Sequence, residues 1–188
     1  MNISRTFALT CVTTTLILPT SLQAQYKSAL IVHADAVHYM DEAREQTQGC
    51  GLLMTATSIN GDFISAVIRL QNEPDTGREL LEYIVTSGNV NYNNGMENFK
   101  YVREAWFETD TIETRSLATS GRSTADYAFS GKINSDSATE LFEQLLHEPF
   151  TMYVDNGQPA DVFAHTFEDA FDNYVKQIAD PCLQAFRQ

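Results

Sequence analysis

The feature that most constrains the fold is an Asn60-Gly61 dipeptide between two segments rich in strand-forming residues, 51–59 and 62–70. Asn-Gly favours the type I′ turn, whose twist matches that of two paired antiparallel strands. In the second segment apolar side chains alternate with polar ones such as Arg69, which is typical of a half-buried strand. The sequence therefore predicts a β-hairpin early in the chain.

Other segments extend the antiparallel pattern. Residues 79–87 fit either a helix or a strand, and their run of strand-forming residues favours a strand. Residues 88–98 are dominated by Asn and Gly, which predicts a loop or a second hairpin tip. Strands are also expected at 99–109 and 127–133, and a second Asn-Gly dipeptide predicts a hairpin with arms at 151–155 and 160–166.

Three helices are expected. Apolar residues recur at helical intervals within 28–47, which predicts a helix at the start of the domain. Ser137 and Glu140 have the spacing of a capping box, and Pro149 follows the apolar stripe of the helix that they would begin. A last helix is expected from Thr166 and should end at Asp180-Pro181.

These elements predict an α+β fold. Its antiparallel sheet would be built from hairpins, with an N-terminal helix, one internal helix and a C-terminal helix. Alternating βαβ units are missing from the pattern, so a parallel nucleotide-binding sheet is not expected. We expect a single domain over residues 25–188.

The first 24 residues have the composition of a secretory signal peptide. Arg5 provides the positive n-region, an uncharged apolar run follows, and Ala24 supplies the small residue before a cut that would leave Gln25 first. The apolar run of about 12 residues is shorter than the roughly 20 that a membrane-spanning helix needs. We therefore expect a periplasmic or secreted protein with no stable membrane span after cleavage.

The net charge of the chain narrows the classes of partner that it could bind. The chain carries a net charge of −13, and without the signal peptide 11 basic residues face 25 acidic ones. Nucleic acids and anionic membranes would be repelled, so neither is expected as a partner.

Cys50 and Cys182 are the cysteines left after cleavage, and an isolated pair in an oxidising compartment is expected to form a disulfide.

Catalytic and cofactor motifs are not found in the sequence. It has no metal-binding histidine spacing, Gly-rich phosphate loop or nucleophile elbow, so no catalytic residue, metal or cofactor is predicted. His165 lies on an apolar strand face, and a small exported hydrolase that uses His165 with an acid or a serine is the alternative hypothesis.

The segment 88–101 is the best candidate for a binding surface, because aromatic rings alternate there with amides. Rings bury area at small entropic cost, and amides adapt their hydrogen bonds to a ligand. The predicted binding residues are Tyr92, Asn94, Phe99 and Tyr101. The leading hypothesis is a non-enzymatic binding module for an unknown protein or saccharide in the envelope or exterior.

Overall fold

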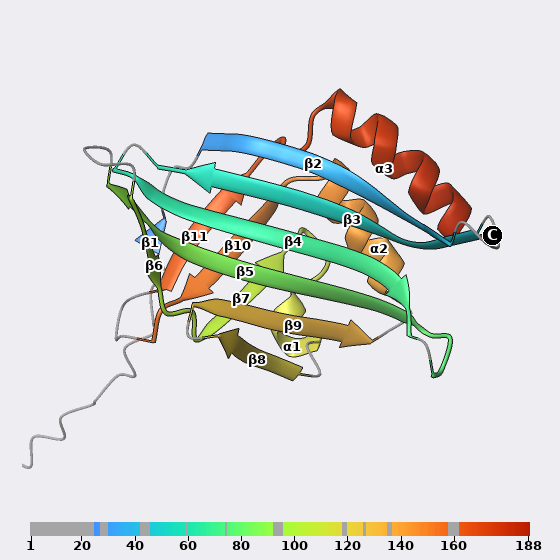
Figure 1. Cartoon of the computed structure of the whole chain (residues 1–188), viewed down its shortest axis with the longest axis horizontal. Coiled ribbons are helices and arrows are strands. Elements are labelled where there is room, and N and C mark those ends of the chain that lie inside the picture. The colour runs from blue at the N-terminus through green and yellow to red at the C-terminus, as the bar shows by residue number, and fades with distance from the viewer. Residues whose placement is uncertain are drawn as a thin grey trace, which may run out of the picture.

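The fold is seen in a computed structural model of the chain (Figure 1). The structure describes residues 25–26, 30–41, 46–58, 60–73, 75–91, 96–117, 120–125, 127–134, 137–157 and 162–188. The predicted signal peptide, with Ala24, and the predicted binding residues Tyr92 and Asn94 lie outside the described residues.

Most of the described residues belong to strands. The strands are β1 (Gln25–Tyr26), β2 (Leu30–Asp41), β3 (Gln46–Thr57), β4 (Asp62–Asn72), β5 (Glu79–Asn91), β6 (Met96–Lys100), β7 (Glu104–Glu108), β8 (Ser120–Ala125), β9 (Ala128–Asn134), β10 (Phe150–Asp155) and β11 (Val162–Phe167). The helices are α1 (Thr114–Leu117), α2 (Ala138–His147) and α3 (Asn173–Phe186).

The strands form two sheets that pack as layers. The large sheet has the order β2-β3-β4-β5-β9-β8, and β6 pairs with the part of β5 that extends beyond β9. The small sheet has the order β1-β11-β10-β7, in which β1 and β11 are parallel and the other pairs antiparallel. Figure 1 shows the small sheet and α2 behind the large sheet, and α3 runs along β2 and β3.

The predicted α+β fold is wrong, because the described residues form mainly antiparallel β-sheet with three short helices. The expected N-terminal helix over 28–47 is replaced by β2 and the start of β3, which pair with each other. The apolar residues of β2 lie on both faces of the sheet, with Ala34 and Ala36 on one face and Val37 and Tyr39 on the other. Apolar residues three and four positions apart therefore occur in β2, although β2 is a strand.

The hairpin at Asn60-Gly61 is confirmed. It joins β3 to β4, and Gly61 has a φ of +81°, which a residue without Cβ adopts at little cost. The favoured strand at 79–87 is also confirmed, as part of β5. The single strand expected over 99–109 is wrong, because the chain leaves the large sheet after Lys100 and enters the small sheet at Glu104.

Two helices have the expected type; α2 differs from the prediction in its cap, and α3 differs in its ends. α2 begins after Ser137, whose side chain makes no capping hydrogen bond; instead, the amide of Thr139 donates to the carboxylate of Glu79 at 3.2 Å. α3 begins at Asn173 instead of near Thr166, and Pro181 lies inside it. Burial of the last turns of α3 against the large sheet outweighs the backbone hydrogen bond that proline removes.

The disulfide between Cys50 and Cys182 fixes α3 to β3. Both cysteines are fully buried, and their Cα atoms are 5.9 Å apart. They are separated by 132 residues, so closing this loop stabilises the fold by about 5 kcal/mol in the chain-entropy description. The cysteines thus lie on two elements that the sequence separates widely.

Tyr83 of β5 joins the two layers. Its side chain is 1% exposed, and its hydroxyl donates to the carbonyl of Ala105 in β7 at 3.1 Å. Its ring meets Phe107 edge to face at 5.2 Å between centroids. Gly131 is the cross-strand partner of Tyr83 in β9, and a Cβ there would lie 2.2 Å from the Cζ of the Tyr83 ring.

We predict that Gly131→Ala lowers the free energy of unfolding by about 1–3 kcal/mol, because the new methyl group displaces the Tyr83 ring. Urea unfolding of Gly131→Ala, of Tyr83→Leu and of the double variant forms the test. The cost of Gly131→Ala should shrink when Tyr83 is already leucine. An equal cost in both backgrounds would show that the ring does not set the requirement for glycine.

Stability should also depend on pH through Tyr83. Burial raises the pKa of its phenol from 10.0 to about 12. Because the unfolded chain loses this proton first, the folded state binds more protons between pH 10 and 12, and stability falls there as pH rises. The phenol should contribute a loss of about 3 kcal/mol across this range, at about 1.4 kcal/mol per pH unit.

Tyr83→Phe removes this titration, and urea unfolding below pH 10 and near pH 12 measures the difference. Below pH 10 the variant should be less stable by about 1 kcal/mol, the usual net value of one hydrogen bond. Towards pH 12 the wild type should lose this advantage. A constant difference over the whole range would contradict the assignment.

Candidate functional site

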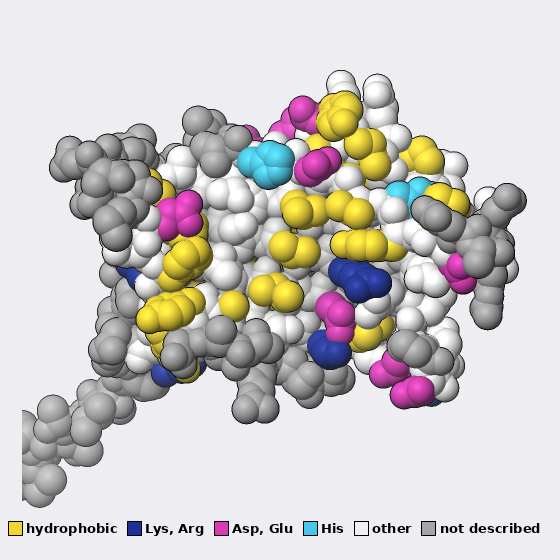
Figure 2. Space-filling view, in the orientation of Figure 1, with side chains coloured by type: hydrophobic (Ala, Val, Ile, Leu, Met, Phe, Trp, Pro, Cys, Tyr) yellow, Lys and Arg dark blue, Asp and Glu magenta, His cyan; other side chains and the backbone are white. Residues whose placement is uncertain are grey.

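The outer face of the large sheet, which faces away from the small sheet, carries exposed apolar side chains. Val67 of β4 and Ile84 of β5 are cross-strand partners, and they are 37% and 44% exposed. Figure 2 shows this face, with hydrophobic side chains gathered over its middle. A sheet face left open to water is usually polar, so these side chains mark the outer face as a candidate interaction surface.

A groove opens on the outer face near the β3–β4 turn and β6. We call it the outer groove. It has a volume of about 430 Å³, within the usual range for small binding sites. It is lined by four hydroxyl side chains, two aromatic rings, a valine and a glutamate: Thr55, Thr57, Phe63, Ser65, Thr86, Val90, Glu97 and Phe99.

Two aromatic rings form one wall of the outer groove. Phe63 is 8% exposed, and Phe99 of β6 meets it edge to face at 5.5 Å between centroids. Gly88 lies between them in the sheet, and a Cβ there would approach the Phe63 ring to 2.6 Å. The glycine therefore permits Phe63 to lie flat on β5, and Phe63 in turn supports Phe99.

Phe99 remains available to a ligand, since 46% of it is exposed. Its other neighbour is Tyr127, 52% exposed, with 6.4 Å between the ring centroids. Exposed rings that are already supported by packing bind with little further loss of freedom, because few rotamers remain to be fixed. The pair extends the apolar surface from the outer groove towards β9.

The structure describes two of the four predicted binding residues, Phe99 and Tyr101. Phe99 lines the outer groove, whereas Tyr101 does not, although it is 48% exposed. The ring of Tyr101 lies near the turn after β10, where a Cβ on Gly157 would be 3.4 Å from it. Tyr92 and Asn94 fall outside the described residues.

Sequence reasoning missed Phe63 and Tyr127. Phe63 stands directly after the predicted hairpin turn, on the strand face opposite Ile64. Its apolar ring lies on the polar face of the predicted strand, and this position could have identified Phe63 as a candidate binding residue. Tyr127 carried no such signal, because its approach to Phe99 depends on how β9 is placed in the sheet.

One carboxylate, that of Glu97, lines the outer groove. The neighbouring Asp62 lies on the other face of β4, beside His165, and pairs with Lys100 at 3.1 Å. Glu97 is exposed, and no ion pair with it is found among the described residues. With a net charge of −13 on the whole chain, the groove favours a partner that brings positive charge.

His165, the residue of the alternative hydrolase hypothesis, is buried between the layers. It is 6% exposed and is the cross-strand partner of Met152 in β10. Asp62 and Ser87 line a cavity beside it, so an acid and a serine do lie nearby. This cavity has a volume of about 10 Å³, about the space of one water molecule, and it cannot admit a substrate.

The part of the chain that the structure describes contains no group of three or more His, Cys, Asp or Glu side chains placed to hold a metal ion. Within the same residues, no helix has the length and apolar character needed to cross a membrane. No protein-family model, curated protein or solved structure matches the chain. The geometry of the outer face is therefore the basis for a functional assignment.

Proposed function

We propose that the protein is an exported, non-enzymatic binding module that docks a protein partner on the outer face of its large sheet. The occupant of the outer groove would be an apolar or aromatic side chain flanked by basic residues. The proposal rests on one observation: the exposed ring of Phe99 packs against Phe63 at the edge of an open groove.

Export is supported by three features. The first 24 residues have the composition of a signal peptide. Cleavage after Ala24 would retain β1, whose Gln25 and Tyr26 pair with β11. The disulfide between Cys50 and Cys182 is compatible with an oxidising compartment.

A protein partner fits the outer face better than a saccharide does. Exposed apolar side chains form two clusters on the outer face, Phe99 with Tyr127 and Val67 with Ile84, and a row of hydroxyl side chains lies between them. Apolar clusters among polar groups are typical of protein interfaces. The hydroxyls of Thr55 and Ser65 hydrogen-bond to each other at 3.0 Å, so they are partly satisfied without a sugar.

The test uses capped synthetic peptides with one phenylalanine flanked by lysines, matched peptides flanked by aspartates, and a neutral oligosaccharide such as cellohexaose. Calorimetric titration should show the lysine-flanked peptide binding at least about tenfold more tightly than the aspartate-flanked one. Phe99→Ala should weaken it by about tenfold, the usual effect of removing an aromatic anchor.

The matched control is Tyr174→Ala, which removes an exposed ring on α3, away from the outer face. This variant should bind the lysine-flanked peptide like the wild type. Equal losses for Phe99→Ala and Tyr174→Ala would contradict the proposal. So would a preference for the oligosaccharide, or no saturable binding of the lysine-flanked peptide.

A further inference from the structure

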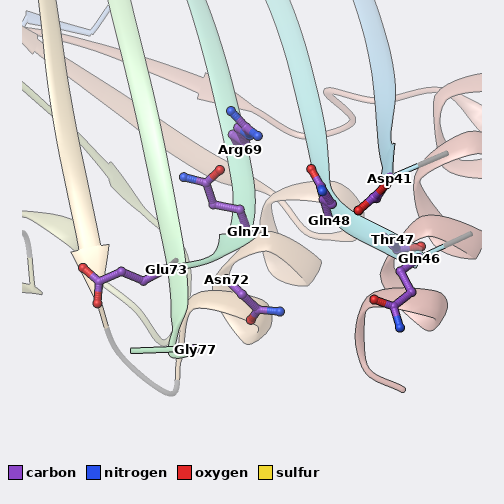
Figure 3. A pocket seen from close by; sticks show the side chains of 9 residues that line it. All are labelled: Asp41, Gln46, Thr47, Gln48, Arg69, Gln71, Asn72, Glu73 and Gly77. Carbon is purple, nitrogen blue, oxygen red and sulfur yellow. The ribbon is translucent and has the colours of Figure 1, made fainter. Parts of the chain in front are cut away.

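A second, polar pocket opens at the opposite end of the strands from the outer groove. Its volume is about 550 Å³, and the nine residues labelled in Figure 3 line it. They come from the end of β2, the start of β3, the end of β4 and the β4–β5 turn. Figure 3 shows amide side chains, carboxylates and the guanidinium of Arg69 around this pocket.

Arg69 is the unusual residue in the pocket. Its guanidinium carbon lies 4.4 Å from the centre of the Tyr39 ring, which holds it by a cation–π contact. The Nε atom of Arg69 is buried and has no hydrogen-bond partner among the described residues. Nε therefore lacks the acceptor that buried donors normally have, and because it is closed off from solvent, a ligand in the pocket would meet the Nη groups of Arg69 instead.

Nearby acids do not supply that acceptor. Glu82 is the cross-strand partner of Arg69, but its two carboxylate oxygens receive Lys132 at 2.5 Å and Gln71 at 3.1 Å. By contrast, three other arginines of the chain, Arg103, Arg115 and Arg187, each bind a carboxylate. Among the described residues, Arg69 forms no ion pair with an acid.

We propose that this pocket binds a sugar acid, with the carboxylate of the ligand received by the guanidinium of Arg69. A guanidinium held over a ring presents its outer donors as a planar fork, which matches the two oxygens of a carboxylate. The proposal is independent of what occupies the outer groove.

The other side chains that line the pocket select the hydroxyl-bearing part of the ligand. Amides such as Gln48, Gln71 and Asn72 offer donors and acceptors, as sugar hydroxyls require. Asp41 and Glu73 can accept from hydroxyls, and the Thr76 hydroxyl lowers the pKa of Glu73, so that this carboxylate remains charged at neutral pH. The carboxylates of Asp41 and Glu73 in the pocket lining oppose a second negative charge on the ligand, so a monoanion is favoured over a dianion such as phosphate.

The test is calorimetric titration of the mature protein with D-galacturonate, D-glucuronate, galacturonate methyl ester and inorganic phosphate. One or both acids should bind, and the methyl ester at least about tenfold more weakly, since it lacks the charged oxygens. Arg69→Gln should abolish binding of the acids. Arg69→Lys keeps the charge but loses the fork, and should weaken binding by about tenfold.

Arg187→Gln is the matched control, because it removes an arginine that already pairs with Glu143 on another part of the molecule. It should leave the titration unchanged, as should Phe99→Ala in the outer groove. Three results would overturn the proposal: no saturable binding of either acid, phosphate binding as tightly as the acids, or unchanged binding by Arg69→Lys and Arg69→Gln. Thermal unfolding of both Arg69 variants shows whether they are folded.

Discussion

Tyr83 of β5 connects the large sheet to the second layer through a hydrogen bond and an aromatic contact. A large sheet must bury one apolar face, and β5 is a central strand of this one. Tyr83 carries the ring that fills the space between the sheets, and its hydroxyl donates to β7. Gly131 makes the position possible, because any side chain there would occupy the volume of the ring.

This layering leaves the outer face open. The small sheet and two helices cover the inner face, and α3 is further fixed to β3 by the disulfide. The inner face therefore determines the stability of the fold, while substitutions on the outer face should change the free energy of unfolding only a little. The rings of the outer groove and the guanidinium of Arg69 lie at opposite ends of the same strands, so one molecule could hold a protein partner and a small anionic ligand together.

Local sequence signals predicted the elements that local interactions determine. The hairpin at Asn60-Gly61 depends on two residues of the turn, and the strand at 79–87 on its own β-branched and aromatic residues. β2 could not be recognised in this way. Its apolar residues lie on both faces, and only pairing with β3 distinguishes this strand from a helix. The late start of α3 likewise depends on β11 continuing to Phe167.

The candidate sites show the same limit. Phe99 could be predicted because aromatic and amide residues are concentrated around it in the sequence. Phe63 and Tyr127 join it only through the order of the strands, which no short motif encodes. Arg69 was recognised as a residue of the polar strand face, but its lack of an acidic partner follows from the cross-strand contacts of Glu82 with Lys132 and Gln71.

The outer face is proposed as a docking surface, and the inner face is core. Hydroxyl-radical footprinting with mass spectrometry tests this division, on the purified protein and on the protein in its native envelope fraction. In the purified protein Phe99 and Tyr174 should be oxidised while Tyr83 is protected, and in the envelope fraction Phe99 should become protected while Tyr174 stays reactive. Equal oxidation of Phe99 in both samples would contradict the claim.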